Sequence, residues 1–339
     1  TDELIVTPGA KQALYETFQA LIDEGASGHP GDGGASGHPG DGGASGHPGD
    51  GGASGHPDEV VLLDPAWVSY EAMAKMAGAD ISRVDLSPHE FQLAPALDEL
   101  GETVSDDTEL LVINSPSNPS GAVFTDEALE GVRDLAVEHD ITVISDEIYD
   151  AITYGVEQTS LGSLDGMGDR TVTINGFSKA YSMTGWRLGY LAAPEPLVEQ
   201  VGKLHSHSVS CATNFVQHAG IEALENTDEA VVEMRDAFEE RRDMLIDRFE
   251  SHGKDVPFPD GAFYMMLPVD EDCAGLDGQR LGDGEAVDQA WCEGAIEEAH
   301  VATVPGSAFG TPGYARLSYA ASEERLKEGV ERLADAGYL

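Results

Sequence analysis

The chain has 339 residues, which suffices for one large domain with a smaller one, or for two domains of similar size. Its 18 lysines and arginines oppose 63 aspartates and glutamates, giving a formal net charge of -45 at pH 7. Such a surface repels phosphate groups, which argues against nucleic acid and anionic membranes as partners. The acidic residues are spread among periodic apolar ones. This pattern favours a globular enzyme with a solvated acidic shell, as in a high-salt cytoplasm, over a disordered acidic tail.

The cysteines and the apolar runs indicate a cytoplasmic location. Cys211, Cys273 and Cys292 are odd in number and lack CxxC spacing, which predicts unpaired thiols in a reducing compartment. No apolar run in the sequence approaches the length of a membrane span, and the first residues do not have the pattern of a signal peptide. The first residue is a threonine, which is consistent with a fragment of a longer chain.

The first elements are predicted over residues 3–24, as a short strand, a Pro-Gly turn and a helix with Leu14 and Phe18 on its apolar face. Residues 26–57 then repeat the unit ASGHPGDGG and end on a partial copy, with His29, His38, His47 and His56 at matching positions. The repeat has no apolar side chain larger than alanine and proline, so it cannot form a solenoid core. We expect a flexible insertion at a surface turn, with metal binding by the histidines as the alternative.

After the repeat, strand and helix patterns alternate. Strands are predicted for residues 59–64, 108–116, 141–149 and 170–176, and helices for 67–78 and 125–139. Apolar strands between helices predict an α/β fold with a mostly parallel sheet covered on both faces.

The C-terminal part is predicted to form a smaller α/β domain. A charged pattern over 222–250 predicts one long helix that links two domains, and strands are expected over 261–267 and 315–320. We therefore divide the chain into a large domain, 1–237, which carries the repeat, and a small domain, 238–339.

Polar residues interrupt these patterns at the carboxyl ends of the predicted strands, where ligands bind in open α/β sheets. After the first strand, Gly9, Ala10 and Lys11 enter a helix and offer backbone N–H groups to a phosphate. Asn114 and Asn118 follow a later strand.

Two further strands are followed by polar side chains that one ligand could bind together. Asp146 and Tyr149 come at the end of one strand, and Lys179 and Arg187 come after the next. Taken singly, Lys179 could be a surface lysine, Asp146 a helix cap and Arg187 an ion-pair partner. Together they suit pyridoxal phosphate. That cofactor needs an amine for its aldehyde, a carboxylate for its ring nitrogen and anion contacts for its phosphate.

Four motifs, NSPSNPSGAVF, VISDEIYDAITY, FSKAYSMTGWRLGY and ARLSYAAS, resemble those of fold-type I, class I/II aminotransferases, near the prokaryotic aspartate aminotransferase branch. The resemblance covers nearly everything outside the repeat. It implies the α/β architecture of that fold type, pyridoxal 5′-phosphate as cofactor, and a homodimer. In the family, a segment precedes the point at which this sequence begins, and no residue here matches it.

The resemblance also implies a role for each site residue. Lys179 forms the Schiff base with the cofactor and moves the proton between the substrate Cα and the cofactor C4′. Asp146 pairs with the pyridine nitrogen, Tyr149 and Asn118 contact the 3-oxygen, and Trp67 stacks on the ring. The phosphate is bound by the backbone of Gly9, Ala10 and Lys11 and by Ser178 and Arg187, and the substrate by Arg316, at its α-carboxylate, and by Asn118. No metal site is implied.

We therefore predict an enzyme that moves an amino group from an aspartate-like or broad range of L-amino acids to a 2-oxo acid such as 2-oxoglutarate. A pyridoxal-phosphate-dependent C–S β-lyase is the alternative within the same chemistry, since it would use the same lysine, aspartate and arginine. A catalytically impaired fragment of the family is the alternative outside it.

Overall fold

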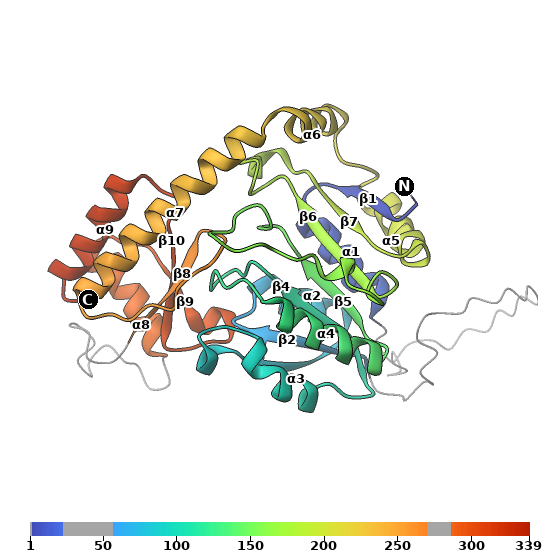
Figure 1. The fold of residues 1–339 in the computed structure, drawn as a ribbon, viewed down its shortest axis with the longest axis horizontal. Coiled ribbons are helices and arrows are strands. Elements are labelled where there is room, and N and C mark those ends of the chain that lie inside the picture. The colour runs from blue at the N-terminus through green and yellow to red at the C-terminus, as the bar shows by residue number, and fades with distance from the viewer. Residues whose placement is uncertain (1, 23–56, 270–285) are drawn as a thin grey trace, which may run out of the picture.

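The fold is described from a computed structural model, which defines residues 2–22, 57–269 and 286–339 (Figure 1). The repeat, apart from Pro57, lies outside the described residues. The expected flexible insertion and the alternative metal site at its histidines therefore lie outside them too, as does Cys273. Of the other cysteines, Cys211 and Cys292 are free thiols, as expected.

One large sheet organises the N-terminal two thirds of the chain. Its strands are β1 (Leu4–Thr7), β2 (Glu59–Asp64), β3 (Asp80–Asp85), β4 (Thr108–Asn114), β5 (Thr142–Asp146), β6 (Thr171–Gly176) and β7 (Gly189–Ala192). Within the described residues, the strand order is β1-β7-β6-β5-β4-β2-β3. Only β7 runs antiparallel to its neighbours, so the predicted mostly parallel sheet is confirmed.

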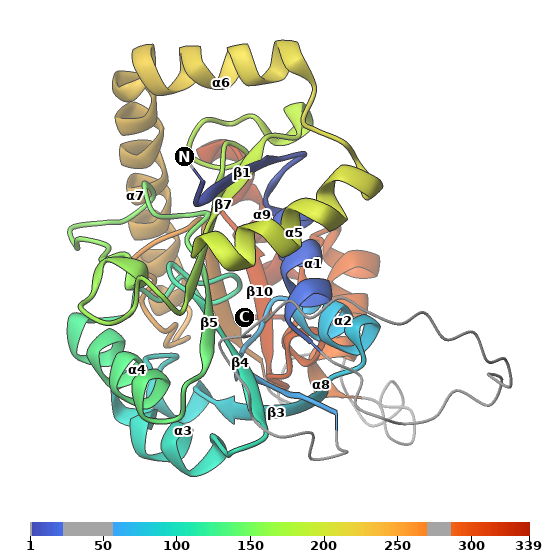
Figure 2. The ribbon, with the colours of Figure 1, turned by 90° about the vertical axis from the view of Figure 1, so that its right-hand side faces the viewer.

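Helices cover both faces of this sheet, on opposite sides in Figure 2. One face carries α1 (Ala10–Leu21), α2 (Val68–Ala77) and α5 (Glu195–Ser208), and the other carries α3 (Leu97–Thr103) and α4 (Asp126–Glu138). Successive strand residues point to opposite faces. Val60 and Leu62 of β2 join the cluster under α1 and α2, whereas Val61 and Leu63 join the cluster under α3 and α4. This two-sided burial explains the continuous apolar runs of these strands.

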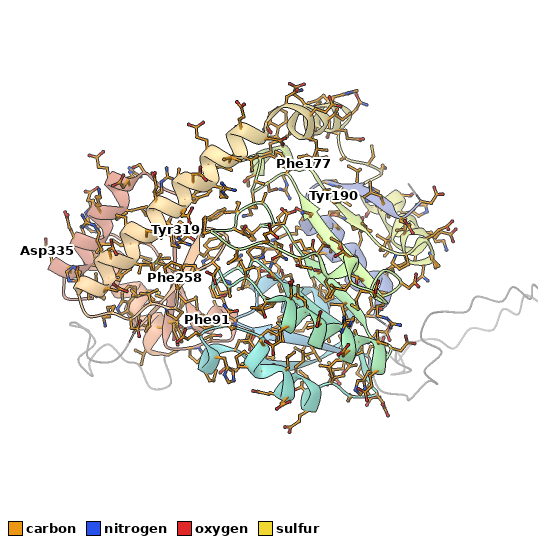
Figure 3. The ribbon with its side chains drawn as sticks, viewed as in Figure 1. Phe91, Phe177, Tyr190, Phe258, Tyr319 and Asp335 are labelled. Carbon is orange, nitrogen blue, oxygen red and sulfur yellow. The ribbon has the colours of Figure 1, made fainter. Side chains whose placement is uncertain are left out.

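A smaller sheet of β8 (Tyr264–Pro268), β9 (Val304–Pro305) and β10 (Tyr314–Ser318) follows, all antiparallel. It packs with α7 (Asp228–Ser251), α8 (Val287–Gly294), the π-helical turn η5 (Ala295–Ala299) and α9 (Glu323–Asp335). Tyr319, labelled in Figure 3, lies with its ring centroid 6.4 Å from that of Phe238 on α7. Short 3₁₀ turns connect the elements: η1 (Ser87–His89), η2 (Ala94–Ala96), η3 (Leu161–Ser163), η4 (Thr184–Trp186) and η6 (Gly306–Phe309).

The prediction of one helix over 222–250 is wrong. Two helices, α6 (Asn214–Asn226) and α7, meet at Thr227, whose backbone (φ -124°, ψ 14°) leaves the helical region. Asn226, Thr227 and Asp228 are all weak helix formers, which explains a break at this point. Figure 1 shows that α7 still runs from the large sheet to the small one, as expected of a linking helix. The boundary predicted at residues 237 and 238 lies inside it.

Three strands of the described residues are not predicted from the sequence. β3 carries three charged residues in six at the sheet edge, so it has no apolar run, and β7 and β9 are only four and two residues long. Among the described residues, no helix is both long and apolar enough to span a bilayer.

Candidate active site

The parallel strands bring the predicted site residues to one end of the large sheet, the end at which these strands finish. Asp64, Asn114, Asp146 and Gly176 are the last residues of β2, β4, β5 and β6, so their carboxyl ends lie side by side. Lys179 follows β6 by three residues. The first turn of α1 follows β1, which runs parallel to β6. Residues distant in sequence therefore lie at the same end of the sheet, where ligands bind in open α/β folds.

The Asp146 carboxylate, at the carboxyl end of β5, is buried, with 4% of the residue exposed. It accepts hydrogen bonds from the Tyr70 hydroxyl (2.7 Å) and the Ile148 N–H (3.2 Å). Burial raises the pKa of Asp146 to about 6, although both hydrogen bonds and the Lys179 charge act in the opposite direction. Among the described residues it has no ion-pair partner. A cationic ring nitrogen would supply the counter-charge that this buried carboxylate lacks.

Tyr70 was not singled out from the sequence. It lies on α2, three residues after Trp67, and is itself buried, with 2% exposed. A tyrosine in an apolar helix pattern resembles a core residue, so only its hydrogen bond to a carboxylate 76 positions away identifies its role. Trp67 directly precedes α2 and lies edge-on to Tyr70, with ring centroids 5.4 Å apart.

The Tyr70→Phe variant tests that hydrogen bond. Losing the donor should raise the pKa of Asp146 above about 6, because the hydrogen bond favours the charged form. We expect cofactor affinity at pH 7 to fall roughly tenfold, the scale of one charge-assisted hydrogen bond. Equilibrium titration of the cofactor-free protein measures this, with Tyr15→Phe on α1 as the matched control. Equal affinities of the two variants would contradict the proposed support of Asp146.

A chain of hydrogen bonds links Asp146 to Arg316. The Asn114 amide donates to the Asp146 carbonyl (2.9 Å), the Asn118 N–H donates to Asn114 Oδ1 (2.8 Å), and Arg316 Nη1 donates to Asn118 Oδ1 (2.9 Å). The predicted pairing of Asn118 and Arg316 at one site therefore holds in space. Asn114, noted in the sequence only as a strand-end residue, connects the two.

Arg316 is a half-buried cation without an acidic partner among the described residues. Its guanidinium carbon lies 4.6 Å from the Tyr264 ring centroid and 5.0 Å from that of Phe309, and its Nε has no hydrogen-bond partner there. Burial lowers the pKa of Arg316. In a chain with 63 acidic residues, a guanidinium without a carboxylate is available to bind one from a substrate.

Lys179 lies in the turn after β6, between aromatic rings. Its Nζ is 5.2 Å from the Tyr149 ring centroid and 5.3 Å from that of Phe263. The Tyr149 and Tyr264 hydroxyls are 3.4 Å apart. This half-buried amine has no acidic partner within ion-pair distance among the described residues, so it is free to react or to carry a proton.

The turn between β1 and α1 can hold a phosphate. Gly9 (φ 88°) precedes α1, whose first turn has neither an acidic residue nor a side-chain cap, which leaves the N–H groups of Ala10 and Lys11 for an anion. The Gly9 N–H, predicted to contact the phosphate, donates instead to the Thr7 carbonyl (2.7 Å). A Cβ on Gly9 would lie 2.9 Å from Arg187 Cζ, so only glycine lets the guanidinium approach this turn. Arg187 donates to the Thr184 carbonyl (3.0 Å), and Ser178 lies in the turn just before Lys179.

The Lys11 side chain points toward Trp67 and Ser69, away from the turn at which its backbone N–H is predicted to bind the phosphate. Its ammonium lies 4.5 Å from the Trp67 ring centroid and donates to Ser69 Oγ (3.2 Å). The predicted backbone contact and this side-chain position are compatible, because N–H and side chain leave a helix start in different directions. Together, the anion cradle, the unpaired buried carboxylate and the two free cations fit the phosphate, ring nitrogen, aldehyde and substrate requirements of pyridoxal phosphate.

A family model, aminotransferase class I and II, matches residues 53–333. The chain belongs to this family. Its sequence is 37% identical to that of the aspartate aminotransferase of Thermotoga maritima over 335 residues, which is 98% of this chain and 75% of that protein. It is 39% identical to a probable aspartate/prephenate aminotransferase of Aquifex aeolicus, with the same coverage, 98% and 75%.

A solved aromatic aminotransferase of Pyrococcus horikoshii superposes on this aminotransferase with a TM-score of 0.82 and 36% sequence identity, covering 99% of this chain and 81% of that one. The resemblance inferred from the four motifs is therefore confirmed. The chain has the fold-type I architecture and is a pyridoxal-phosphate-dependent aminotransferase.

Proposed function

We propose that this aminotransferase moves amino groups from an acidic or broad range of L-amino acids to 2-oxo acids such as 2-oxoglutarate. The observation that carries the proposal is Arg316, a half-buried guanidinium without an acidic partner among the described residues, hydrogen-bonded to Asn118. A planar fork of donors matches an α-carboxylate bidentately. The names of the relatives, which include aspartate, prephenate and aromatic aminotransferases, support this range of donors.

We propose a role for each site residue, as the family resemblance implies and as its place in the structure supports. Bound pyridoxal phosphate supplies an aldehyde for the substrate amine and a ring that stabilises negative charge at the substrate Cα. The N–H groups of Ala10 and Lys11 and the side chains of Ser178 and Arg187 would bind the phosphate. Gly9 would contribute by letting Arg187 approach the turn, because its own N–H donates to the Thr7 carbonyl (2.7 Å).

Trp67 would cover one face of the ring and Asp146 would keep its nitrogen protonated. Tyr149 and Asn118 would bind the ring oxygen. Lys179 Nζ would take the proton from the substrate Cα and deliver it to the cofactor C4′, because this amine lies between the Tyr149 and Phe263 rings without an acidic partner among the described residues.

The Lys11 ammonium supports an acidic donor. It lies beside the Trp67 ring, so a substrate above the cofactor would meet a cation near its side chain. A panel of L-aspartate, L-glutamate and L-phenylalanine with 2-oxoglutarate tests the donor range. With L-aspartate or L-phenylalanine, stoichiometric formation of L-glutamate would support transfer. L-Glutamate is tested with oxaloacetate in place of 2-oxoglutarate, and L-aspartate is then the expected product. We expect L-aspartate to be the best donor.

A C–S β-lyase remains the alternative, because it needs the same lysine, aspartate and arginine. A sulfur amino acid without any 2-oxo acid separates the two reactions. Thiol and ammonia release at a higher kcat/KM than amino transfer would overturn the proposal. Absence of both reactions, with the cofactor bound, would indicate a catalytically impaired member of the family.

The Arg316→Lys variant tests the carboxylate-binding role. A lysine keeps the charge but loses the bidentate fork and the contact with Asn118. We expect kcat/KM for L-aspartate to fall about 100-fold, mainly through KM, and cofactor affinity to stay within about twofold, since loss of a charge-assisted pair costs roughly 1.5–3 kcal/mol. Arg325→Lys on α9 is the matched control. An unchanged KM would remove Arg316 from the substrate site.

We also propose that the chain acts as a cytoplasmic homodimer in a high-salt environment, with a large domain of residues 1–237 and a small domain of 238–339. The net charge of -45 supports the high-salt setting, because concentrated cations screen acidic repulsion. Exposed apolar side chains on α6, Phe215, Ile221 and Leu224, support a partner surface. The division into two domains is supported by the two separate sheets, one in each proposed domain. Light scattering at low and high salt measures the oligomeric state.

A further inference from the structure

The loop of residues 306–310, which contains η6 and is called here the η6 loop, lies against the guanidinium of Arg316. The Phe309 ring centroid is 5.0 Å from Arg316 Cζ, so the loop forms one wall of the substrate-carboxylate site. The loop connects β9 to β10 and therefore belongs to the small sheet. Its N-terminal part is held on that side, because the Ser307 N–H donates to the buried Asp288 carboxylate (2.7 Å).

The same loop touches the large sheet at two points, Asp64 at the end of β2 and Ala66 just after it. The Ala66 N–H donates to the Phe309 carbonyl (2.9 Å). The Asp64 carboxylate lies against Gly310, where an added Cβ would be 2.5 Å from Asp64 Cγ and 2.6 Å from Oδ1. Asp64 and Ala66 immediately precede Trp67, the proposed ring platform. One short segment therefore carries the platform and both contacts with the η6 loop.

The Asp64 side chain is fixed in place. It is buried, with 4% exposed, and forms an ion pair with Arg83, which also pairs with Glu71 (2.6 Å). Burial raises the pKa of Asp64 to about 6, against the charge and hydrogen bond of Arg83 and with a smaller contribution from Asp85 and Glu71. A fixed carboxylate that fills the space beside Gly310 resists movement of the loop toward β2.

We propose that Asp64 is a positioning residue that sets the place of the η6 loop, and through Phe309 the place of the Arg316 guanidinium, relative to Trp67. The Asp64–Gly310 contact then determines how far the substrate-carboxylate site lies from the cofactor ring. A displacement on the scale of 1 Å between reacting groups costs about 100-fold in rate, so such a spacer matters for substrate use more than for folding. The inference rests on the roles proposed above for Arg316 and Trp67.

Gly310→Ala tests this contact, because the new methyl group collides with Asp64 and pushes the loop away. Gly310 also has a φ of 83°, so alanine there carries backbone strain as well. Gly313→Ala is the matched control. It lies three residues on, has a φ of 87°, and its added Cβ would meet nothing within 4 Å. The two variants share the strain and differ in the collision.

The experiment uses the cofactor-loaded enzyme and two readouts, KM for L-aspartate and calorimetric Kd for succinate, a dicarboxylate that cannot transaminate. For Gly310→Ala we expect both constants to rise about tenfold or more, with cofactor affinity unchanged. For Gly313→Ala we expect values close to those of the original chain. In the Asp64→Ala background the collision is absent, so adding Gly310→Ala should then raise the two constants by less than about threefold.

Equal effects of Gly310→Ala and Gly313→Ala would overturn the inference, as would an effect of Gly310→Ala that persists undiminished with Asp64→Ala. Both outcomes require an original chain that binds succinate and transfers amino groups. If the original chain does neither, the proposed function itself fails, and the two failures are thereby distinguished.

Discussion

The Lys179→Ala variant is expected to lose amino transfer almost completely, by about 10⁴-fold or more in kcat. In the proposed role, the lysine amine both holds the cofactor aldehyde and acts as the base at Cα, and general acid–base catalysis alone contributes 10²–10⁴-fold. Its ammonium lies between the Tyr149 and Phe263 rings, and no second lysine is placed there by the described part of the chain. Coupled measurement of L-glutamate formation from L-aspartate checks the rate.

Two controls separate the amine from the charge and from the fold. Lys179→Arg keeps a cation but cannot deprotonate, so it should be as inactive as the alanine variant. Lys203→Ala, on the exposed side of α5, should retain full activity. The absorbance of bound cofactor supplies a readout besides turnover, because loss of the lysine removes the visible band while phosphate binding persists. Activity of Lys179→Ala within tenfold of the original chain would contradict the assigned role.

The Asp146→Asn variant is expected to have the second-largest effect, a fall of about 10²–10³-fold in kcat. A neutral amide cannot keep the ring nitrogen protonated, and removing one preorganised electrostatic contact in a buried site costs on this scale. Steady-state kinetics with L-aspartate measures the loss. Asp165→Asn, on an exposed loop, is the matched control. A loss below tenfold would mean that the ring nitrogen does not depend on this carboxylate.

The pH dependence of cofactor binding provides a second readout on Asp146. Its pKa in the cofactor-free protein is about 6, raised by burial, so the carboxylate is charged above this pH and neutral below it. Affinity for pyridoxal phosphate should therefore fall as pH decreases through about 6. The cofactor phosphate also titrates near pH 6, and that contribution remains in Asp146→Asn. The difference between the two titrations isolates the carboxylate.

Glu109→Gln is the control for other groups with raised pKa values. Burial raises the pKa of Glu109 to about 7, but this residue lies near the start of β4, at the opposite edge of the sheet. Its replacement should leave the pH step in cofactor affinity intact.

Asp146→Asn should not lower the thermal stability of the cofactor-free protein at pH 8. A carboxyl whose folded pKa is raised destabilises the fold when ionised, so removing its charge relieves that cost.

Much of the large sheet could be predicted from the sequence. β2, β4, β5 and β6 are apolar on both faces because helices cover both sides, so each produces a continuous run bounded by polar residues. The ends of those runs identified Asn114 and Asp146, and the motifs around Lys179 identified the family, which the comparisons confirm. Short or charged elements escaped, because β3 and β7 draw their stability from neighbouring strands instead of from their own apolar side chains.

The sequence by itself determined the type of fold, the cofactor class and most of the residues at the sheet edge, because these depend on local patterns and on short motifs. The tertiary structure decided which of them meet. Tyr70 reaches Asp146 across 76 positions, and Arg316 reaches Asn118 across 198. The Asp64–Gly310 contact joins two segments with no shared pattern. Such pairings depend on how packed elements bring distant chain segments together, and neither partner's local sequence carries information about the other.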